Sequence, residues 1–164
     1  MKQASTSFSD NPNPSDTFKW HRSRITVQVS DTDHGGGVYH GRYFALYNTA
    51  RDAFFADMGI PYLSLINAGL NLSIAELHTR YIKPVYYGDA IMVWTRISWM
   101  RDRSLGIIQK MMCDPPASRE TRLKNRVEIN LVCTDSDGQA VCLPAQFVRA
   151  VETYYGHPLS RETD

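Results

Sequence analysis

The chain has 164 residues, 43% of them hydrophobic, and its formal net charge at pH 7 is +1. This length suits a single domain that buries roughly two-thirds of the surface of its unfolded chain. A charge so close to balance gives no strong field for nucleic acid or an anionic membrane, so neither is expected as a partner. The sequence contains no apolar run of about 18 residues, the length that a membrane-spanning helix needs.

The two ends of the chain differ in composition from its middle. Residues 1–17 are rich in Ser, Asn, Pro and Asp and predict a disordered arm rather than a signal peptide. We expect the folded domain to span residues 18–155, and residues 156–164 to form a flexible tail. Cys113, Cys133 and Cys142 are odd in number and show no Cys-x-x-Cys spacing, which is typical of reduced thiols in a cytoplasmic protein.

The first predicted elements are a strand and a long helix. Ile25, Val27 and Val29 alternate with polar residues, the period-2 pattern of a half-buried strand, and this strand leads to Asp31 and Asp33. Beyond the glycines at 35–37 the apolar spacing changes to the 3.6 period of a helix. Its apolar side is predicted to hold Tyr43, Leu46, Tyr47, Ala50, Ala53 and Phe54, opposite Asn48, Thr49 and Asp52.

The predicted helix is apolar around much of its girth and ends at a clear stop. Phe44 and Phe55 lie beside the main apolar side, which indicates burial on more than one side. Gly59 suits a helix C-terminus, and Pro61 cannot continue a helix. Residues 62–70 then predict a brief helical turn before the pattern changes.

The rest of the chain predicts strands. Five apolar or alternating stretches lie at 71–83, 90–100, 105–113, 123–134 and 141–151. Turns are expected at 101–104 and at Asp137-Gly138, an irregular loop between Cys113 and Leu123, and a departure from the sheet at Pro84. One long helix and several mostly antiparallel strands predict an α+β fold in which the sheet curls around the helix.

The segment between the first strand and the helix is the best candidate for chemistry. The glycines allow another group to approach the main chain closely. A helix that begins near residues 40–42 presents unpaired N–H groups and the positive end of its dipole to a developing negative charge. The alternative is that Asp31 or Asp33 only caps a turn. No standard metal spacing is present, so neither a metal nor a cofactor is expected.

The motif Asp31-Thr32-Asp33-x-Gly-Gly-x-Val38-Tyr39-His40-x-x-Tyr43 resembles the hotdog-fold acyl-CoA thioesterases of the 4-hydroxybenzoyl-CoA thioesterase-like group. The resemblance extends from about residue 19 to residue 152. Three further motifs support it, namely Ala50-Arg51, Tyr81-Ile82-Lys83-Pro84 with Gly88-Asp89, and Arg101-x-x-Ser104.

The resemblance implies a hotdog fold, an antiparallel sheet wrapped around one central helix. It also implies a homodimer or homotetramer with active sites between subunits, and hydrolysis of an acyl-CoA to free acid and CoA. Asp33 matches the catalytic carboxylate of the family, and His40 lies at or next to the backbone N–H that binds the oxyanion. Asp33 acts either as general base or as nucleophile, and Asp31 is expected to hold the turn.

The substrate-binding residues expected from these motifs fall into two groups. Gly36, Gly37, Val38 and Tyr39 would form a cradle for the thioester. Arg101 and Arg103, in a predicted tight turn, would meet the phosphates of CoA, with solvated surface charge as the alternative. The basic segment from Arg119 to Arg126 is a second candidate for the phosphates.

Two positions depart from the family pattern. Asn48 stands where many relatives carry Glu, one turn before the match to Arg51, and His34 stands where relatives often have a small residue. Aromatic residues near the helix start suggest an aromatic acyl group. Release of an acyl or polyketide chain from an acyl carrier protein is the alternative activity, and a non-catalytic acyl-ligand binding module is the alternative from another class.

Overall fold

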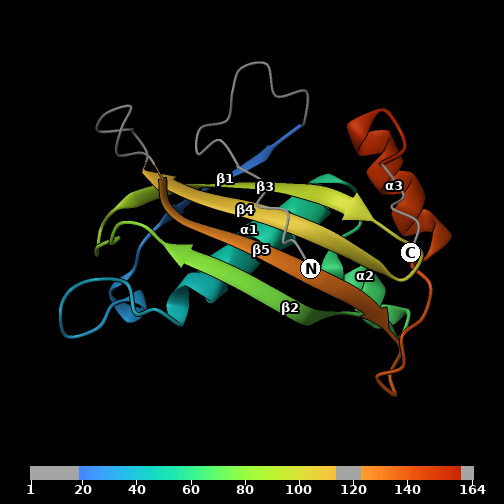
Figure 1. Cartoon of the computed structure of the whole chain (residues 1–164), viewed down its shortest axis with the longest axis horizontal. Coiled ribbons are helices and arrows are strands. Elements are labelled where there is room, and N and C mark those ends of the chain that lie inside the picture. Colours follow the sequence, from blue (N-terminus) through green and yellow to red (C-terminus); the bar gives the residue numbers. More distant parts are fainter. Residues whose placement is uncertain (1–18, 114–122, 160–164) are drawn as a thin grey trace, which may run out of the picture.

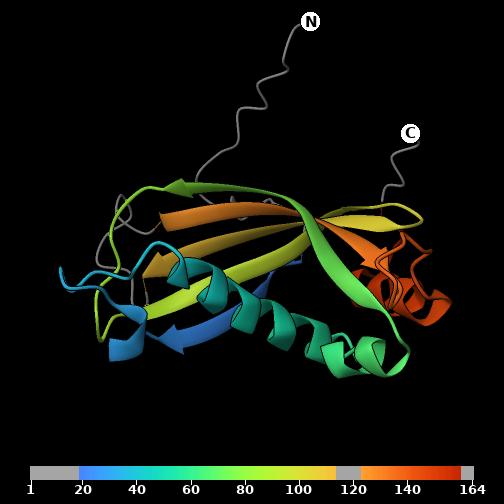
Figure 2. The same cartoon turned by 90° about the horizontal axis from the view of Figure 1, so that it is seen from below.

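The computed structural model describes residues 19–113 and 123–159. Its main elements are a five-stranded antiparallel sheet and one long helix packed against it. The strands lie in the order β1-β3-β4-β5-β2. They are β1 (His21–Thr26), β2 (Asn71–Tyr81), β3 (Ala90–Met100), β4 (Ser104–Cys113) and β5 (Leu123–Thr134). Helix α1 (Arg42–Asp57) lies along the concave face of the curved sheet (Figures 1 and 2). The predicted α+β hotdog fold is confirmed.

Helix α1 buries a broad side, as its wide apolar girth predicts. Tyr47, Ala50 and Phe54 are fully buried, and Phe55 is 1% exposed. Ala53 was placed on the buried side by its spacing, but it is exposed, and Arg51 is buried in its place. The long Arg51 side chain is buried because it extends to a hydrogen bond with the Gln109 side chain on β4. The Ala53 side chain has no polar group that could form such a bond.

Most predicted turns and ends are confirmed. Helix α1 stops before Gly59, which has a φ of 78°, and the short helix α2 (Tyr62–Asn67) follows. The backbone N–H of Arg101 donates to the carbonyl of Ser104 across the β3–β4 turn at 2.8 Å. Strand β2 ends at Tyr81, so the chain has left the sheet by Pro84.

The fifth predicted strand, over residues 141–151, is wrong. The chain makes the predicted turn at Gly138 and one isolated bridge between Thr134 and Ala140, and it then forms helix α3 (Ala145–Tyr155). The apolar residues of this region recur every four positions, a helical spacing that places one face on the core. The buried members are Leu143, Phe147 and Val151.

The strand expected over 25–30 lies earlier in the chain than predicted. Strand β1 ends at Thr26, and a 3-10 turn, η1 (Val29–Asp31), follows. Val29 is 72% exposed in this turn. The carboxylate of Asp31 accepts a hydrogen bond from the backbone N–H of Gln28, which bends the chain back before another strand residue can pair.

Some expectations fall on residues that the structure does not describe. These are the N-terminal arm over 1–17, the loop over 114–122 and, of the tail predicted over 156–164, residues 160–164. Within residues 19–113 and 123–159, no helix combines the length and apolar character needed to cross a bilayer. The same residues contain no group of three or more His, Cys, Asp or Glu side chains arranged to hold a metal ion.

Candidate active site

The loop between β1 and α1 is built on the buried carboxylate of Asp31. The residue is 4% exposed, and Oδ1 accepts hydrogen bonds from Arg42 Nη2 at 2.7 Å and Nε at 3.1 Å. Oδ2 accepts from the backbone N–H of Gln28 at 2.9 Å. Charge-assisted bonds of this kind are the strong ones in proteins. Asp31 therefore ties the loop to the first residue of α1, the turn-holding role that its position predicts.

Asp33 lies two residues further on, in the opposite environment. Its carboxylate is exposed, and Oδ1 accepts one hydrogen bond from the backbone N–H of Gly35 at 2.8 Å. The backbone N–H of Asp33 donates to the carbonyl of Gly37 at 2.9 Å, which closes the turn. Gly36 has a φ of 75°, in the left-handed region that favours glycine. This turn holds the Asp33 carboxylate in place while leaving it open to solvent.

The far side of the loop is pinned to the connection between β2 and β3. The backbone N–H of Val38 donates to the carbonyl of Val85 at 2.8 Å, and Gly37 forms a bridge with Tyr86. The Val38 side chain is buried, so it packs beneath the loop, whereas Tyr39 is 47% exposed on its surface. Gly36, Gly37, Val38 and Tyr39 thus form one continuous stretch of main chain between Asp33 and His40.

His40 stands immediately before the N-terminus of α1, as predicted. The N-cap residue Gly41 offers no side-chain cap, and in the described part of the chain no acceptor is bonded to the backbone N–H of His40. The carbonyl of His40 accepts a hydrogen bond from the hydroxyl of Tyr81 at 3.0 Å. The helix N-terminus carries a partial positive charge, so this end of α1 suits an anionic oxygen.

Tyr81 is the residue of this site that motif spacing missed. Its ring packs edge-on against Tyr43, with centroids 5.1 Å apart, and this contact directs its hydroxyl to the His40 carbonyl. The motif containing Tyr81 supported the family resemblance, but no sequence signal indicated that the last residue of a strand would reach the helix start. Burial raises the pKa of Tyr81, so its hydroxyl stays protonated and keeps donating.

Hydrogen bonds link the polar side chains buried beneath the site. The hydroxyl of Tyr47 donates to Asn125 Oδ1 at 2.7 Å, and Gln109 Nε2 donates to the Tyr47 carbonyl at 3.0 Å. Burial raises the pKa of Tyr47 well above its usual value. These buried contacts lock the first turns of α1 onto β4 and β5, which fixes the direction of the helix N-terminus.

At the position where many relatives carry a Glu, this chain has Asn48, which is hydrogen-bonded to Arg51. Arg51 Nη2 donates to Asn48 Oδ1 at 2.6 Å, and Arg51 Nη1 donates to Gln109 Oε1 at 3.4 Å. Burial lowers the pKa of Arg51. Asn48 supplies a neutral acceptor to the guanidinium where a Glu would supply a charge, so its side chain has no ionisable group for catalysis.

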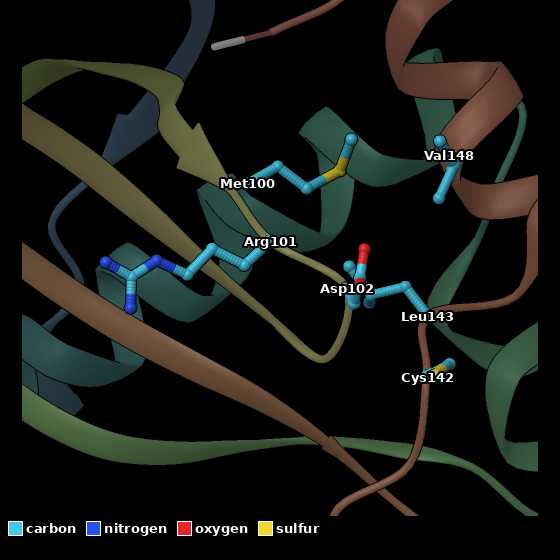
Figure 3. A pocket seen from close by; sticks show the side chains of 6 residues that line it. All are labelled: Met100, Arg101, Asp102, Cys142, Leu143 and Val148. Atoms are coloured by element: carbon cyan, nitrogen blue, oxygen red, sulfur yellow. The ribbon is translucent and has the colours of Figure 1, made fainter. Parts of the chain in front are cut away.

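Arg101 and Arg103 do not lie near Asp33 within one chain. They occupy the β3–β4 turn, whereas the loop contacts the opposite end of β3, where Val27 N–H donates to the Asp89 carbonyl at 3.0 Å. The eleven residues of β3 separate the two ends by roughly 33 Å. Figure 3 shows Arg101 and Asp102 beside a cavity of about 120 Å³, with the Arg101 guanidinium pointing away from Leu143 and Val148.

The sequence of this chain matches the model of the thioesterase-like superfamily over residues 27–151. This stretch includes the Asp33 loop, α1 and all strands after β1. The chain belongs to this superfamily, and it is a thioester hydrolase of the hotdog fold.

Similar proteins include the acyl-CoA thioester hydrolase YbgC of Escherichia coli O6:H1. It is 29% identical over 118 residues, which cover 72% of this chain and 82% of that protein. A 1,4-dihydroxy-2-naphthoyl-CoA thioesterase from Synechocystis has a similar structure, with a TM-score of 0.73 at 18% identity over 85% of this chain and all of that one. The gentisyl-coenzyme A thioesterase BH1999 has a TM-score of 0.68 at 20% identity, over 80% and 98% of the two chains.

Proposed function

We propose that this chain hydrolyses an acyl-CoA thioester to a free acid and CoA at the loop between Asp33 and His40. The observation that carries this proposal is the pairing of an exposed, hydrogen-bonded carboxylate with an uncapped helix N-terminus in one turn-rich loop. Membership of the thioesterase-like superfamily and the similarity to an acyl-CoA thioester hydrolase support the same activity.

In this proposal the thioester carbonyl oxygen binds the backbone N–H at or next to His40. Water attacks the carbonyl carbon, the oxygen becomes anionic, and the C–S bond then breaks to release the CoA sulfur. A backbone donor of this kind typically stabilises the transition state by about 3 to 4 kcal/mol. Asp33 takes the proton of the attacking water and passes it to the leaving sulfur, a role typically worth ~10² to 10⁴-fold in rate. Direct attack of Asp33 to form a mixed anhydride is the alternative path.

The surroundings of the loop support an aromatic acyl group. Four exposed tyrosines gather at this end of the molecule, and offset or edge-on ring packing favours an aromatic partner. They are Tyr39, Tyr81, Tyr86 and Tyr87. Two of the structural relatives are named for aromatic acyl-CoA substrates, which supports the same preference.

The assembly belongs to the proposal as well. We infer a homodimer or homotetramer, because β2 is an edge strand and Ile74 on it is 52% exposed. A second subunit would be needed to bring Arg101 and Arg103 to the phosphates of a CoA bound at the loop. Cys113, Cys133 and Cys142 are all free thiols, which supports the proposed cytoplasmic location.

A panel of aliphatic and aromatic acyl-CoAs, followed by release of free thiol, tests the proposed function. We expect turnover, with the highest kcat/KM for an aromatic acyl group. Tight binding of acyl-CoAs without turnover of any would identify a binding module instead. The same acyl groups carried on an acyl carrier protein test the alternative activity, release of an acyl chain from that carrier. A carrier-protein thioesterase would have a higher kcat/KM for the carrier-bound substrate than for the acyl-CoA.

A further inference from the structure

A recess opens on the outer face of the sheet, the face turned away from α1. Its volume is about 270 Å³, and β2 and β5 supply its lining, His78, Thr79, Arg80, Arg126 and Glu128. We call it the outer recess. None of its residues belongs to the Asp33 loop, and the proposed mechanism leaves all of them without a role.

Two arginines face each other across the outer recess. Arg80 on β2 and Arg126 on β5 are direct partners in the antiparallel register. Side chains at such positions lie about 5 Å apart at Cβ, and like charges placed there destabilise a sheet. Glu128 offsets the charge of Arg126, and an anion bound beside Arg80 would offset the other charge.

The carboxylates near the outer recess are already engaged. Glu128 forms an ion pair with Arg126. Glu76 accepts hydrogen bonds from His78 at 2.9 Å and from Asn130 at 2.7 Å. In the part of the chain that the structure describes, Arg80 forms no ion pair. The outer recess therefore keeps a net positive charge at the Arg80 position.

The outer recess lies at the same end of the sheet as the Asp33 loop. Arg80 directly precedes Tyr81, whose hydroxyl donates to the His40 carbonyl at 3.0 Å. Lys124, two residues before Arg126, donates from Nζ to the Pro84 carbonyl at 3.2 Å, which holds the ends of β2 and β5 together. Arg80 and His40 thus lie at the same end of β2, with the outer recess on the face of the sheet opposite α1.

We propose that the outer recess binds one phosphate group at the nucleotide end of CoA, with Arg80 as the main ligand and Arg126, paired with Glu128, beside it. This proposal rests on the proposed function, which places the acyl end of the same molecule at His40. The planar guanidinium fork matches the oxygens of a phosphate and binds them bidentately. A concave recess of this volume suits a compact phosphate group better than the broad acidic surface of a carrier protein.

The test compares one acyl group carried on CoA and on pantetheine, which lacks the nucleotide. For the variant Arg80→Gln we expect KM for acyl-CoA to rise about tenfold with kcat unchanged, the pattern of lost ground-state binding. Both constants for acyl-pantetheine should equal those of the wild type. Arg80→Glu should raise KM for acyl-CoA further. Arg149→Gln, the same change of charge on the exposed face of α3, should leave all constants unchanged.

Three outcomes would overturn the proposal. KM for acyl-CoA unchanged in both Arg80 variants would exclude the outer recess, and equal losses on both substrates would show that Arg80 acts on the fold or the loop. A raised KM for an acyl carrier protein alone would assign the recess to a protein partner. If the wild type hydrolyses neither small substrate, the proposed function fails, and calorimetric titration with CoA still tests the recess, because loss of affinity in Arg80→Gln needs no turnover.

Discussion

The two ends of the sheet differ in what their contacts do. At the end that holds the Asp33 loop, exposed groups such as Asp33 and Tyr39 stand on a frame of buried hydrogen bonds from Asp31. At the other end, α3 covers the sheet with apolar side chains, and Phe147 is 1% exposed. This chain therefore separates reactivity from stability by roughly the length of a strand, so substitutions at the two ends should affect different measurements.

The largest effect is expected for Asp33→Asn. The amide keeps the size of the side chain and can still accept from Gly35 N–H, but it cannot take a proton or attack a thioester. We expect hydrolysis to fall by ~10² to 10⁴-fold, measured as free thiol release with the best acyl-CoA. The midpoint of urea unfolding should match the wild type, because Asp33 is exposed. Undiminished hydrolysis would move the catalytic carboxylate elsewhere and remove the contrast between the two ends.

Phe147→Ala should give the converse result at the other end. The Phe147 ring packs against Phe55 of α1, with centroids 5.8 Å apart, so its loss leaves a cavity between α3 and α1. We expect the free energy of unfolding to fall by about 3 to 5 kcal/mol, measured by urea titration. Well below the unfolding transition, kcat should remain at the wild-type value. Gln146→Ala, an exposed change on the same helix, is the matched control, and a fall in kcat with Phe147→Ala would show that α3 also shapes the site.

Asp31→Asn tests the frame beneath the loop. The variant loses the charge of a buried carboxylate that accepts hydrogen bonds from Arg42 and Gln28. Hydrogen bonds to charged groups contribute about 1.5 to 3 kcal/mol, so we expect a fall of that size in the free energy of unfolding. Asp137→Asn, in an exposed turn, should not change it. A stability loss with Asp33→Asn as large as with Asp31→Asn would contradict the separate roles of these two carboxylates.

The sequence predicted the loop end better than the end that carries α3. Asp31, Asp33 and the helix start at residue 42 follow from short-range patterns, because turn chemistry and helix N-termini are local properties of the chain. The contact between Tyr81 and His40 joins residues 41 positions apart, and no local pattern encodes it. At the other end, the apolar run over 141–151 satisfied the composition of a strand, and only its four-residue spacing favoured α3.

The smallest expected effect concerns Tyr155, at the end of α3. Its hydroxyl accepts a hydrogen bond from the backbone N–H of Ile97 at 2.9 Å, where the register of β3 and β4 shifts. Burial raises the pKa of Tyr155 from 10.0 to about 12, so the folded state holds this proton more tightly than the unfolded state. The resulting stabilisation is complete below about pH 10 and is lost as the pH rises to about 12.

Urea unfolding of Tyr155→Phe and the wild type across this alkaline range checks the assignment. Near neutral pH the variant should be about 1 kcal/mol less stable, because it lacks the acceptor for Ile97 N–H. The difference should shrink above about pH 10 and reverse before about pH 12, since only the wild type has the Tyr155 proton to lose and a pKa raised from 10.0 to about 12 outweighs about 1 kcal/mol. Val148→Ala, a change on the same helix that removes no ionisable group, should show a constant difference. A constant difference for Tyr155→Phe as well would mean that Tyr155 stabilises this end through packing alone.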